Sequence, residues 1–256
     1  LVPTYRVDVQ RDVDVIEDIL RIYGYNNVLP GESVKSSISY SSKPDSHKLQ
    51  NLISEQLTGC GFNEILNNSL TKAGYYETLS SFPAANLVMM MNPLSADLNA
   101  MRQTLLFGGL ESVAYNVNRK NQDLKFYEFG NCYYFNGEKK EEGKPLAAYS
   151  EDMHLGMWLT GNKTAQSWVR ADEKTSVFEL KGYVLNILRR LGINFQKLVV
   201  ETEATNDLFA EALVIKNKQG KQLAILGSVA KKQLKALDID VPVFFADLNW
   251  NNLLTE

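Results

Sequence analysis

The strongest constraint in this sequence is the order of its strand-like and helix-like segments. In the second half of the chain, apolar or alternating segments follow one another directly, with a hairpin turn at Asn217–Gly220. Helical patterns lie between the runs of strands rather than after every strand, whereas each parallel pair would need its own crossover. The order therefore predicts an α+β fold with an antiparallel sheet, not a doubly wound parallel one. The expected strands of this part are 126–135, 153–160, 195–201, 212–216, 222–227 and 243–248.

Apolar side chains at helical spacing predict the helices of the same part. Asp45 or Ser46 is the expected N-cap of the first of them, because a short side-chain oxygen can accept free backbone N–H groups. Gly130 is expected at a bulge. The expected helices are 46–60, 72–80, 105–117, 177–191 and 230–237, and shorter strands are expected at 62–70 and 87–91.

The first 30 residues form a separate unit. Residues 5–9 alternate between apolar and polar side chains, which predicts a strand. Asp14 is expected to open a helix, with Glu17 as its capping-box partner and Gly24 at its end. The buried face of this helix is expected to hold Ile16, Ile19, Leu20 and Tyr23.

The Ser-rich stretch 31–45 contains Pro44 and follows Pro30, so we interpret it as a linker to a large domain over 46–256. The chain starts with Leu1 rather than Met, which we interpret as a piece of a longer protein.

Composition excludes several classes of protein. The apolar runs are too short for a membrane-spanning helix, and no signal peptide is visible. A net charge of −3 does not demand the basic face of a dedicated nucleic-acid binder. Cys60 and Cys132 are too few for a disulfide framework and wrongly spaced for zinc, so we expect reduced, half-buried thiols of a cytoplasmic protein.

Familiar nucleotide and relay motifs are missing. The stretch Gly156–Thr164 resembles a phosphate loop, but Asn162 separates the second glycine from Lys163, so we interpret it as a turn that ends a strand. No glycine-rich dinucleotide fingerprint follows a strand. The two histidines, His47 and His154, are interpreted as structural or surface residues rather than catalytic ones.

Four carboxylates of the first unit form a candidate metal site. Asp14, Glu17 and Asp18 stand at i, i+3 and i+4, so a helix would project them from one face, and Asp8 precedes them. A hard cation such as Mg²⁺ prefers oxygen ligands and would neutralise their repulsion. The alternative is a solvated acidic helix start, which the helix dipole favours. Spacing alone leaves both open.

A third group of residues combines Asn92–Ser95, Arg102 and the strand 125–130. The loop, the arginine, a helix and a strand carrying Glu128 follow in a recognisable order. The plain interpretation is core packing around one surface arginine.

Here the sequence resembles the β subunit of bacterial phenylalanyl-tRNA synthetase. Residues 2–30, VPTYRVDVQRDVDVIEDILRIYGYNNVLP, resemble the end of the small domain that precedes the synthetase-like core. Residues 46–256 resemble that core. The most specific core stretch is NPLSADLNAMRQTLLFGGL, and the others are LKFYEFGNCYY, SVFELKGYVLNIL and ILGSVAKKQLKALDIDVPVFFADLN.

The resemblance implies a class II synthetase fold that is catalytically silent. In that family the α subunit holds the active site. A class II site grips ATP with Arg-x-Glu, whereas Arg102 is followed by Gln103 and Thr104, and no arginine occurs after Arg190 to hold the γ-phosphate. We therefore expect no catalytic residues and no ATP site in this chain, although the whole enzyme uses ATP.

The resemblance also implies partners and a metal. Its Mg²⁺ site, shared with the α subunit, falls on Asp8, Asp14, Glu17 and Asp18, the last commonly glutamate in the family and one methylene shorter here. The expected function is assembly: the fragment positions the α subunit in an α2β2 enzyme that joins phenylalanine to tRNA(Phe). The alternatives are a self-sufficient class II-like ligase or paralogue, which pyrophosphate exchange would reveal, and a tRNA-binding module without catalysis.

Overall fold

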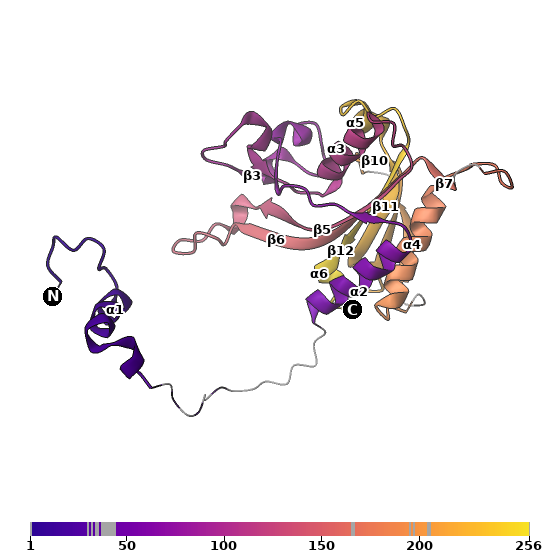
Figure 1. Cartoon of the computed structure of the whole chain (residues 1–256). Helices are drawn as coiled ribbons and strands as arrows, with labels where there is room; N and C mark the ends of the chain where they lie inside the picture. The colour runs from indigo at the N-terminus through magenta and orange to yellow at the C-terminus, as the bar shows by residue number, and fades with distance from the viewer. Residues whose placement is uncertain are drawn as a thin grey trace. The chain divides into compact units, whose positions relative to one another are not determined.

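The computed structural model describes residues 2–29, 31, 33, 36, 45–164, 167–194, 196, 198–203 and 206–255 (Figure 1). The chain divides into two compact units, Leu1–Lys43 and Pro44–Glu256. Most of the expected linker 31–45 lies outside the described residues. Among the helices of the described ranges, none is long and apolar enough to cross a membrane.

Unit 1 contains the helix α1 (Asp12–Tyr23) and the short 3₁₀ helix η1 (Tyr25–Asn27). The expected strand at residues 5–9 is wrong: turns occupy this stretch, with Arg6 N–H donating to the Pro3 carbonyl at 3.0 Å and Val9 N–H to the Arg6 carbonyl at 3.3 Å. Alternation predicts a strand only where a second strand can pair with it, and the described part of unit 1 contains none.

Helix α1 also begins earlier than its acidic residues predicted. Arg11 is the N-cap, and its backbone N–H donates to Asp14 at 2.9 Å, so Asp14 rather than Glu17 takes the capping-box position. Gly24 ends the helix with φ of 91°, as expected. The expected buried face is not buried: Ile16 and Ile19 are 51% and 59% exposed.

Unit 2 is built on a seven-stranded sheet in the order β1-β5-β6-β12-β11-β10-β9 (Figure 1). Neighbouring strands are antiparallel except for the short β1, which pairs with β5 in parallel. This confirms the predicted α+β class. The strands are β1 (Asn63–Glu64), β5 (Leu124–Phe135), β6 (Tyr149–Thr160), β12 (Val243–Asn249), β11 (Gln222–Val229), β10 (Phe209–Asn217) and β9 (Leu198–Glu203).

Two smaller sheets accompany it. The first has the order β2-β4-β3, and the second pairs β7 with β8. Instead of one strand at 62–70, the chain forms two short pieces in different sheets, and the expected helix 72–80 is the 3₁₀ helix η2 (Ala73–Tyr76). The strands are β2 (Leu70–Thr71), β3 (Val88–Met89), β4 (Ala100–Met101), β7 (Asn162–Thr164) and β8 (Glu173–Lys174), and the further 3₁₀ helices are η3 (Ala84–Asn86), η4 (Ala96–Leu98) and η5 (Gly137–Lys139).

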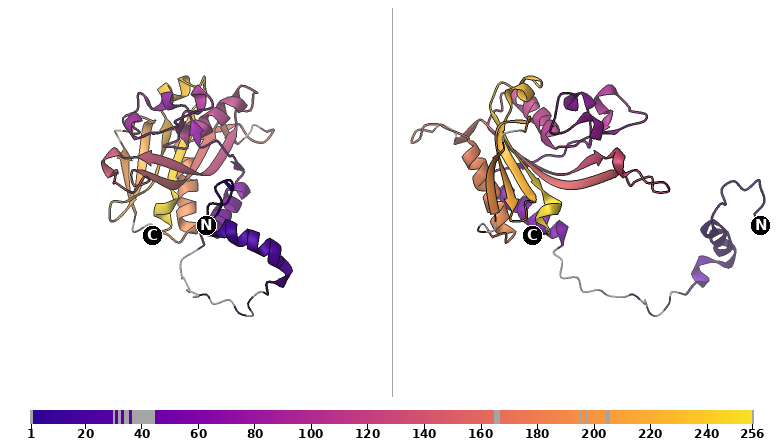
Figure 2. Two further views of the ribbon diagram at one scale, coloured as in Figure 1. Left: turned by 90° about the vertical axis from the view of Figure 1, so that its left-hand side faces the viewer. Right: turned by 180° about the vertical axis from the view of Figure 1, so that it is seen from behind.

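Helices cover both faces of the large sheet. One face packs against α3, and the other packs against α2, α4 and α6, so each face has its own core (Figures 1 and 2). Asp45 caps α2 by accepting from the N–H groups of His47 and Lys48, as predicted. The helices are α2 (Ser46–Gly59), α3 (Leu106–Val117), α4 (Val177–Arg190), α5 (Lys231–Lys235) and α6 (Trp250–Leu253).

Strand β6 shows how alternation fills the two cores. Leu155, Met157 and Leu159 belong to the core beside α2 and α4, whereas Trp158 belongs to the core beside α3. A Cβ at Gly109 would collide with the indole of Trp158, so a glycine lets α3 lie directly on the sheet. Of the two cysteines expected to be half-buried, Cys60 is exposed and Cys132 is fully buried.

Candidate functional site

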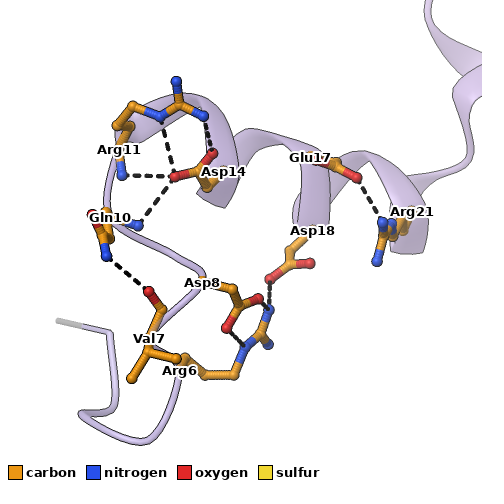
Figure 3. Close-up of polar contacts among 9 residues, drawn as sticks. All are labelled: Arg6, Val7, Asp8, Gln10, Arg11, Asp14, Glu17, Asp18 and Arg21. Carbon is orange, nitrogen blue, oxygen red and sulfur yellow. Dashed lines mark hydrogen bonds and ion pairs between the residues drawn. The ribbon is translucent and has the colours of Figure 1, made fainter. Parts of the chain in front are cut away.

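The four candidate carboxylates of unit 1, Asp8, Asp14, Glu17 and Asp18, each contact an arginine (Figure 3). Asp8 and Asp18 converge on Arg6, whose Nη2 lies 3.0 Å from Oδ2 of Asp8 and 2.9 Å from Oδ2 of Asp18. The second oxygen of Asp8 accepts from Nε at 3.2 Å, which makes this contact bidentate. The Arg6 hydrogen bond also lowers the pKa of Asp8.

The other two carboxylates have different partners. Asp14 accepts from Nη2 of Arg11 at 3.0 Å and from the backbone N–H groups of Arg11 and Gln10. The Arg11 side chain, followed by these N–H groups, lowers the pKa of Asp14 to about 2. Glu17 accepts from Arg21 one turn later at 2.6 Å.

Figure 3 therefore shows Asp8 and Asp18 facing one point, with Asp14 and Glu17 turned to their own arginines. Within the described ranges, no group of three or more His, Cys, Asp or Glu side chains is arranged to hold a metal. The donor chemistry fits Mg²⁺, since all four side chains offer oxygen. In this arrangement the Arg6 guanidinium lies between Asp8 and Asp18.

The second candidate region surrounds Arg102, which precedes α3. Arg102 is 5% exposed and its partner Glu128, in the middle of β5, is fully buried. Nη1 of Arg102 donates to Oε1 of Glu128 at 2.7 Å, and Nε donates to the Asn131 carbonyl at 3.0 Å. Asn67 completes the group by donating from Nδ2 to Oε2 of Glu128 at 2.6 Å. The interpretation of Arg102 as a surface residue is therefore wrong.

Gly130 makes room for this arginine. The register between β5 and β6 is unbroken at Gly130, so the expected bulge is wrong. A Cβ at this position would collide with Nη2 of Arg102. Glycine is needed here because a side chain from outside the sheet passes close over the strand, not because the strand bends.

The two residues after Arg102 are also buried and hydrogen-bonded inside unit 2. Gln103 and Thr104 are 2% and 1% exposed. The Gln103 side chain donates to the Pro83 carbonyl at 3.1 Å, and Thr104 Oγ1 accepts from the N–H of Leu106 at 3.2 Å. The guanidinium of Arg102 is therefore bound by Glu128. That position 104 is threonine instead of glutamate does not by itself determine whether ATP binds.

A buried ion pair lies further along the same sheet face. His154 on β6 and Asp247 on β12 are 8% and 9% exposed, with Nδ1 and Oδ1 2.6 Å apart. Burial lowers the pKa of His154, but the charge and hydrogen bond of Asp247 outweigh it, so the pKa is raised overall. The structural interpretation of His154 is consistent with this pairing, and His47 is exposed in the first turn of α2.

The sequence analysis did not predict the His154–Asp247 pair, because no pattern of residues close in the sequence indicates it. The two residues are separated by 93 positions and meet only through the pairing of β6 with β12, which sets Asn249 opposite His154 and Asp247 opposite Gly156. The stretch resembling a phosphate loop ends β6 with Gly161 at φ of 77° and continues into β7, which agrees with its interpretation as a turn.

Comparison with known proteins identifies the family. The model described as "Phenylalanyl tRNA synthetase beta chain CLM domain" matches residues 29–250, and the model described as "tRNA synthetase B5 domain" matches residues 1–25. The chain belongs to the phenylalanyl-tRNA synthetase β chain family. This confirms the family resemblance seen in the sequence.

Similar curated proteins are phenylalanine–tRNA ligase β subunits. The chain is 63% identical to that of Bacteroides fragilis over 254 residues, which are 99% of this chain and 31% of the relative. It is 49% identical to that of Porphyromonas gingivalis over 256 residues, 100% of this chain and again 31% of the relative. The chain thus spans about a third of the length of these relatives.

Solved structures agree on the fold. A pyrrolysyl-tRNA synthetase from Desulfitobacterium hafniense superposes with a TM-score of 0.59 and 15% identity, covering 100% of this chain and 82% of that one. A second structure, of Desulfitobacterium hafniense PylSc, gives a TM-score of 0.59 and 16% identity over 85% of this chain and 70% of that one. At this identity the likeness shows a synthetase-like fold alone.

The buried Arg102–Glu128 pair predicts how substitutions of Arg102 change the stability of the fold. Replacing Arg102 by Ala leaves a buried carboxylate without its cation, so the free energy of unfolding should fall by about 3–5 kcal/mol. Arg102→Lys retains the charge but loses the hydrogen bond from Nε–H to the Asn131 carbonyl. Its free energy of unfolding should therefore lie between those of Arg102→Ala and the original chain. Urea unfolding measures the change.

The control is Lys72→Ala, which removes the exposed pair of Lys72 with Asp97. Such a pair contributes at most about 1 kcal/mol. Equal losses for Arg102→Ala and Lys72→Ala would contradict the structural role of Arg102.

The His154–Asp247 pair generates a pH prediction. Because folding raises the pKa of His154, its pairing should stabilise the fold fully below the ordinary histidine pKa of about 6.5 and progressively less as pH rises through the raised pKa. The stability difference between the original chain and His154→Asn should therefore be larger at acidic than at alkaline pH. Urea unfolding across pH, with exposed His47→Asn as control, tests this; a constant difference would refute it.

Proposed function

We propose that this chain is the non-catalytic, synthetase-like core of a phenylalanine–tRNA ligase β subunit, with part of the small domain before it. The family match over residues 29–250 carries this proposal. In our assignment residues 1–30 end the small domain, 31–45 link it, and 46–256 form the core. The whole enzyme uses ATP to join phenylalanine to tRNA(Phe) in the cytoplasm, and this part supports the α subunit in an α2β2 assembly.

The polar chemistry of the sheet face supports a silent core. The side chains that could act on a substrate there are paired with one another: Arg102 with Glu128, and His154 with Asp247. Both pairs are buried, so their groups stabilise the fold instead of facing a ligand. The absence of an arginine after Arg190 removes the planar fork that would hold a γ-phosphate.

A direct test separates this proposal from a self-sufficient ligase. The chain alone should show no ATP–pyrophosphate exchange with phenylalanine or with any other standard amino acid, and adding the α subunit should restore exchange with phenylalanine. Exchange by the purified chain without the α subunit would overturn the silent-core proposal.

The surface offered to the α subunit is the loop 90–99, which connects β3 to β4 ahead of α3, together with the outer side of that helix. One side of α3 is buried against the sheet, and Tyr115, 58% exposed, lies under the guanidinium of Arg119 at 3.4 Å on the outer side. The loop is more apolar: Met91 and Leu94 are each 92% exposed. An exposed apolar patch of this kind is typical of a protein interface.

Charge placed in this loop should prevent assembly. Met91→Asp combined with Leu94→Asp should reduce co-purification with the α subunit at least about tenfold, because a carboxylate must be stripped of water on docking. Pull-down with the purified α subunit measures it.

The matched control is Val169→Asp, an equally radical change at a position 68% exposed. It lies between β7 and β8 in the sequence, and β7 lies at the opposite end of unit 2 from β3 in Figure 1. Unchanged assembly of the double variant would exclude this loop from the interface.

We further propose that Asp8, Asp14, Glu17 and Asp18 contribute to a Mg²⁺ site shared with the α subunit. Their donor atoms suit Mg²⁺, but Arg6, Arg11 and Arg21 occupy them in this structure. Binding to the chain alone is therefore expected to be weak. The ion, when bound, would neutralise these carboxylates and tie them to the neighbouring subunit.

Competition with arginine gives the metal proposal a test. Arg6→Gln should strengthen Mg²⁺ binding by the assembled enzyme, because it frees Asp8 and Asp18, whereas Asp14→Asn with Glu17→Gln should weaken it. Calorimetric titration with MgCl₂ measures both changes in affinity, and Arg170→Gln, at an exposed arginine of unit 2, is the control. Identical Mg²⁺ affinity in all variants would leave only the helix-dipole role for these carboxylates.

A further inference from the structure

Asparagine is followed by glycine at a single place in the sequence. Asn136 is the only asparagine whose next residue is glycine, and both Asn136 and Gly137 are exposed. They connect the end of β5 to η5, at the projecting end of β5 and β6 in Figures 1 and 2. Because glycine has no Cβ, its backbone nitrogen is less shielded than that of other residues. Asn136 is therefore the asparagine of this chain whose side-chain amide is most open to attack by the next nitrogen.

The folded turn holds the reacting atoms apart. The backbone of Asn136 has ψ of 104°, which turns the nitrogen of Gly137 away from Cβ and Cγ of Asn136. To close a five-membered ring with Cγ, this nitrogen must rotate to the side of Cβ, which requires a negative ψ. The folded conformation is thus unreactive, although the local sequence is reactive.

Hydrogen bonds maintain this conformation. Oδ1 of Asn136 accepts from the N–H of Glu138 at 3.0 Å, and the Asn136 carbonyl accepts from the N–H of Lys139 at 3.1 Å. The N–H of Asn136 donates to the Ala148 carbonyl at 2.7 Å, next to the start of β6. Rotation about ψ breaks the first two of these bonds, because both close over the peptide between Asn136 and Gly137. The turn must therefore open before the nitrogen can reach Cγ.

We propose that Asn136 is a deamidation site and that this turn gates its reaction with water. When the turn opens, hydroxide takes the proton of the Gly137 N–H, and the nitrogen attacks Cγ of Asn136. A bond from this nitrogen to Cγ forms, the bond from Cγ to the side-chain nitrogen breaks, and ammonia leaves with a proton from water. Water then opens the succinimide ring to aspartate or isoaspartate. The net reaction converts asparagine and water into an acid and ammonia.

The two products differ in whether the turn can form again. Aspartate keeps the main chain unchanged, and its carboxylate accepts from the N–H of Glu138 in a stronger, charge-assisted bond. Isoaspartate places the side-chain methylene in the main chain, which lengthens the connection between Phe135 and Gly137. Phe135 pairs with Tyr149 at the end of β5 and β6, so isoaspartate should loosen this end of the strand pair and aspartate should not.

The first measurement compares the folded and the unfolded chain. The purified chain is kept in mildly alkaline buffer with and without guanidinium chloride, and peptide mapping in a mass spectrometer follows deamidation. With denaturant, Asn136 should react faster than Asn249, which also accepts a backbone N–H but is followed by the bulky Trp250. Without denaturant, Asn136 should react about tenfold more slowly than with it, because two hydrogen bonds must break first.

The second measurement opens the turn by substitution. Lys139→Pro removes the N–H that donates to the Asn136 carbonyl and disfavours helical geometry at Glu138, while Asn136 and Gly137 stay unchanged. In the folded chain this variant should deamidate faster than the original, and in guanidinium chloride the two should react equally. Gly137→Ala, whose Cβ would make only ordinary contacts with Phe135, should slow the reaction in denaturant.

The outcomes test the site and the gate separately. If Asn136 reacts no faster than Asn249 in guanidinium chloride, the deamidation site is refuted. If Asn136 reacts equally fast with and without denaturant, the gate is refuted, and this comparison needs no variant. Circular dichroism shows whether Lys139→Pro keeps the fold. A folded Lys139→Pro chain that reacts no faster than the original chain would also refute the gate.

Discussion

The ion pair between Arg102 and Glu128 is the interaction on which the rest of unit 2 depends. Glu128 lies at the centre of β5, where a lone carboxylate would be very unfavourable. Its oxygens are satisfied by Arg102 and Asn67, which approach from two other parts of the chain. Removing any one of these side chains would leave the others buried without a hydrogen-bond partner. The pair therefore fixes the position of the segment before α3 on the sheet.

Several neighbouring features follow from this requirement. Gly130 has no side chain because the guanidinium occupies that space. The backbone N–H of Arg102 donates to the Ser69 carbonyl, and its carbonyl accepts from the N–H of Tyr133, so the small sheet and β5 are joined at one residue. Helix α3 then starts next to this point and presses Gly109 against Trp158. The arginine thus organises one complete face of the sheet.

The side-chain arrangement in unit 2 is compatible with the proposed supporting role. On the α3 face of the sheet, Arg102 is paired with Glu128 and His154 with Asp247 inside the protein, while the large apolar side chains of Met91 and Leu94 are exposed. In a catalytic site the reverse arrangement is needed, with charged groups free to meet a substrate.

The sequence by itself determined the class of the fold and the family. Adjacent strands with short turns between them can only pair antiparallel. The helix cap Asp45 and the helix end at Gly24 depend on residues close in the sequence. Both features can therefore be predicted from the local sequence pattern. The four carboxylates of unit 1 were likewise visible from spacing. The arginines at positions 6, 11 and 21 among them were the signal that arginine side chains would neutralise these carboxylates, with Arg6 shared by Asp8 and Asp18.

Only the tertiary structure decided the rest. The strand expected at residues 5–9 failed because alternation describes one strand and not its partner. The burial of Arg102, the reason for Gly130 and the pairing of His154 with Asp247 depend on residues 26 to 93 positions apart. Such contacts are set by the register between strands, and that register is fixed by the packing of the whole sheet, which no local window of sequence contains.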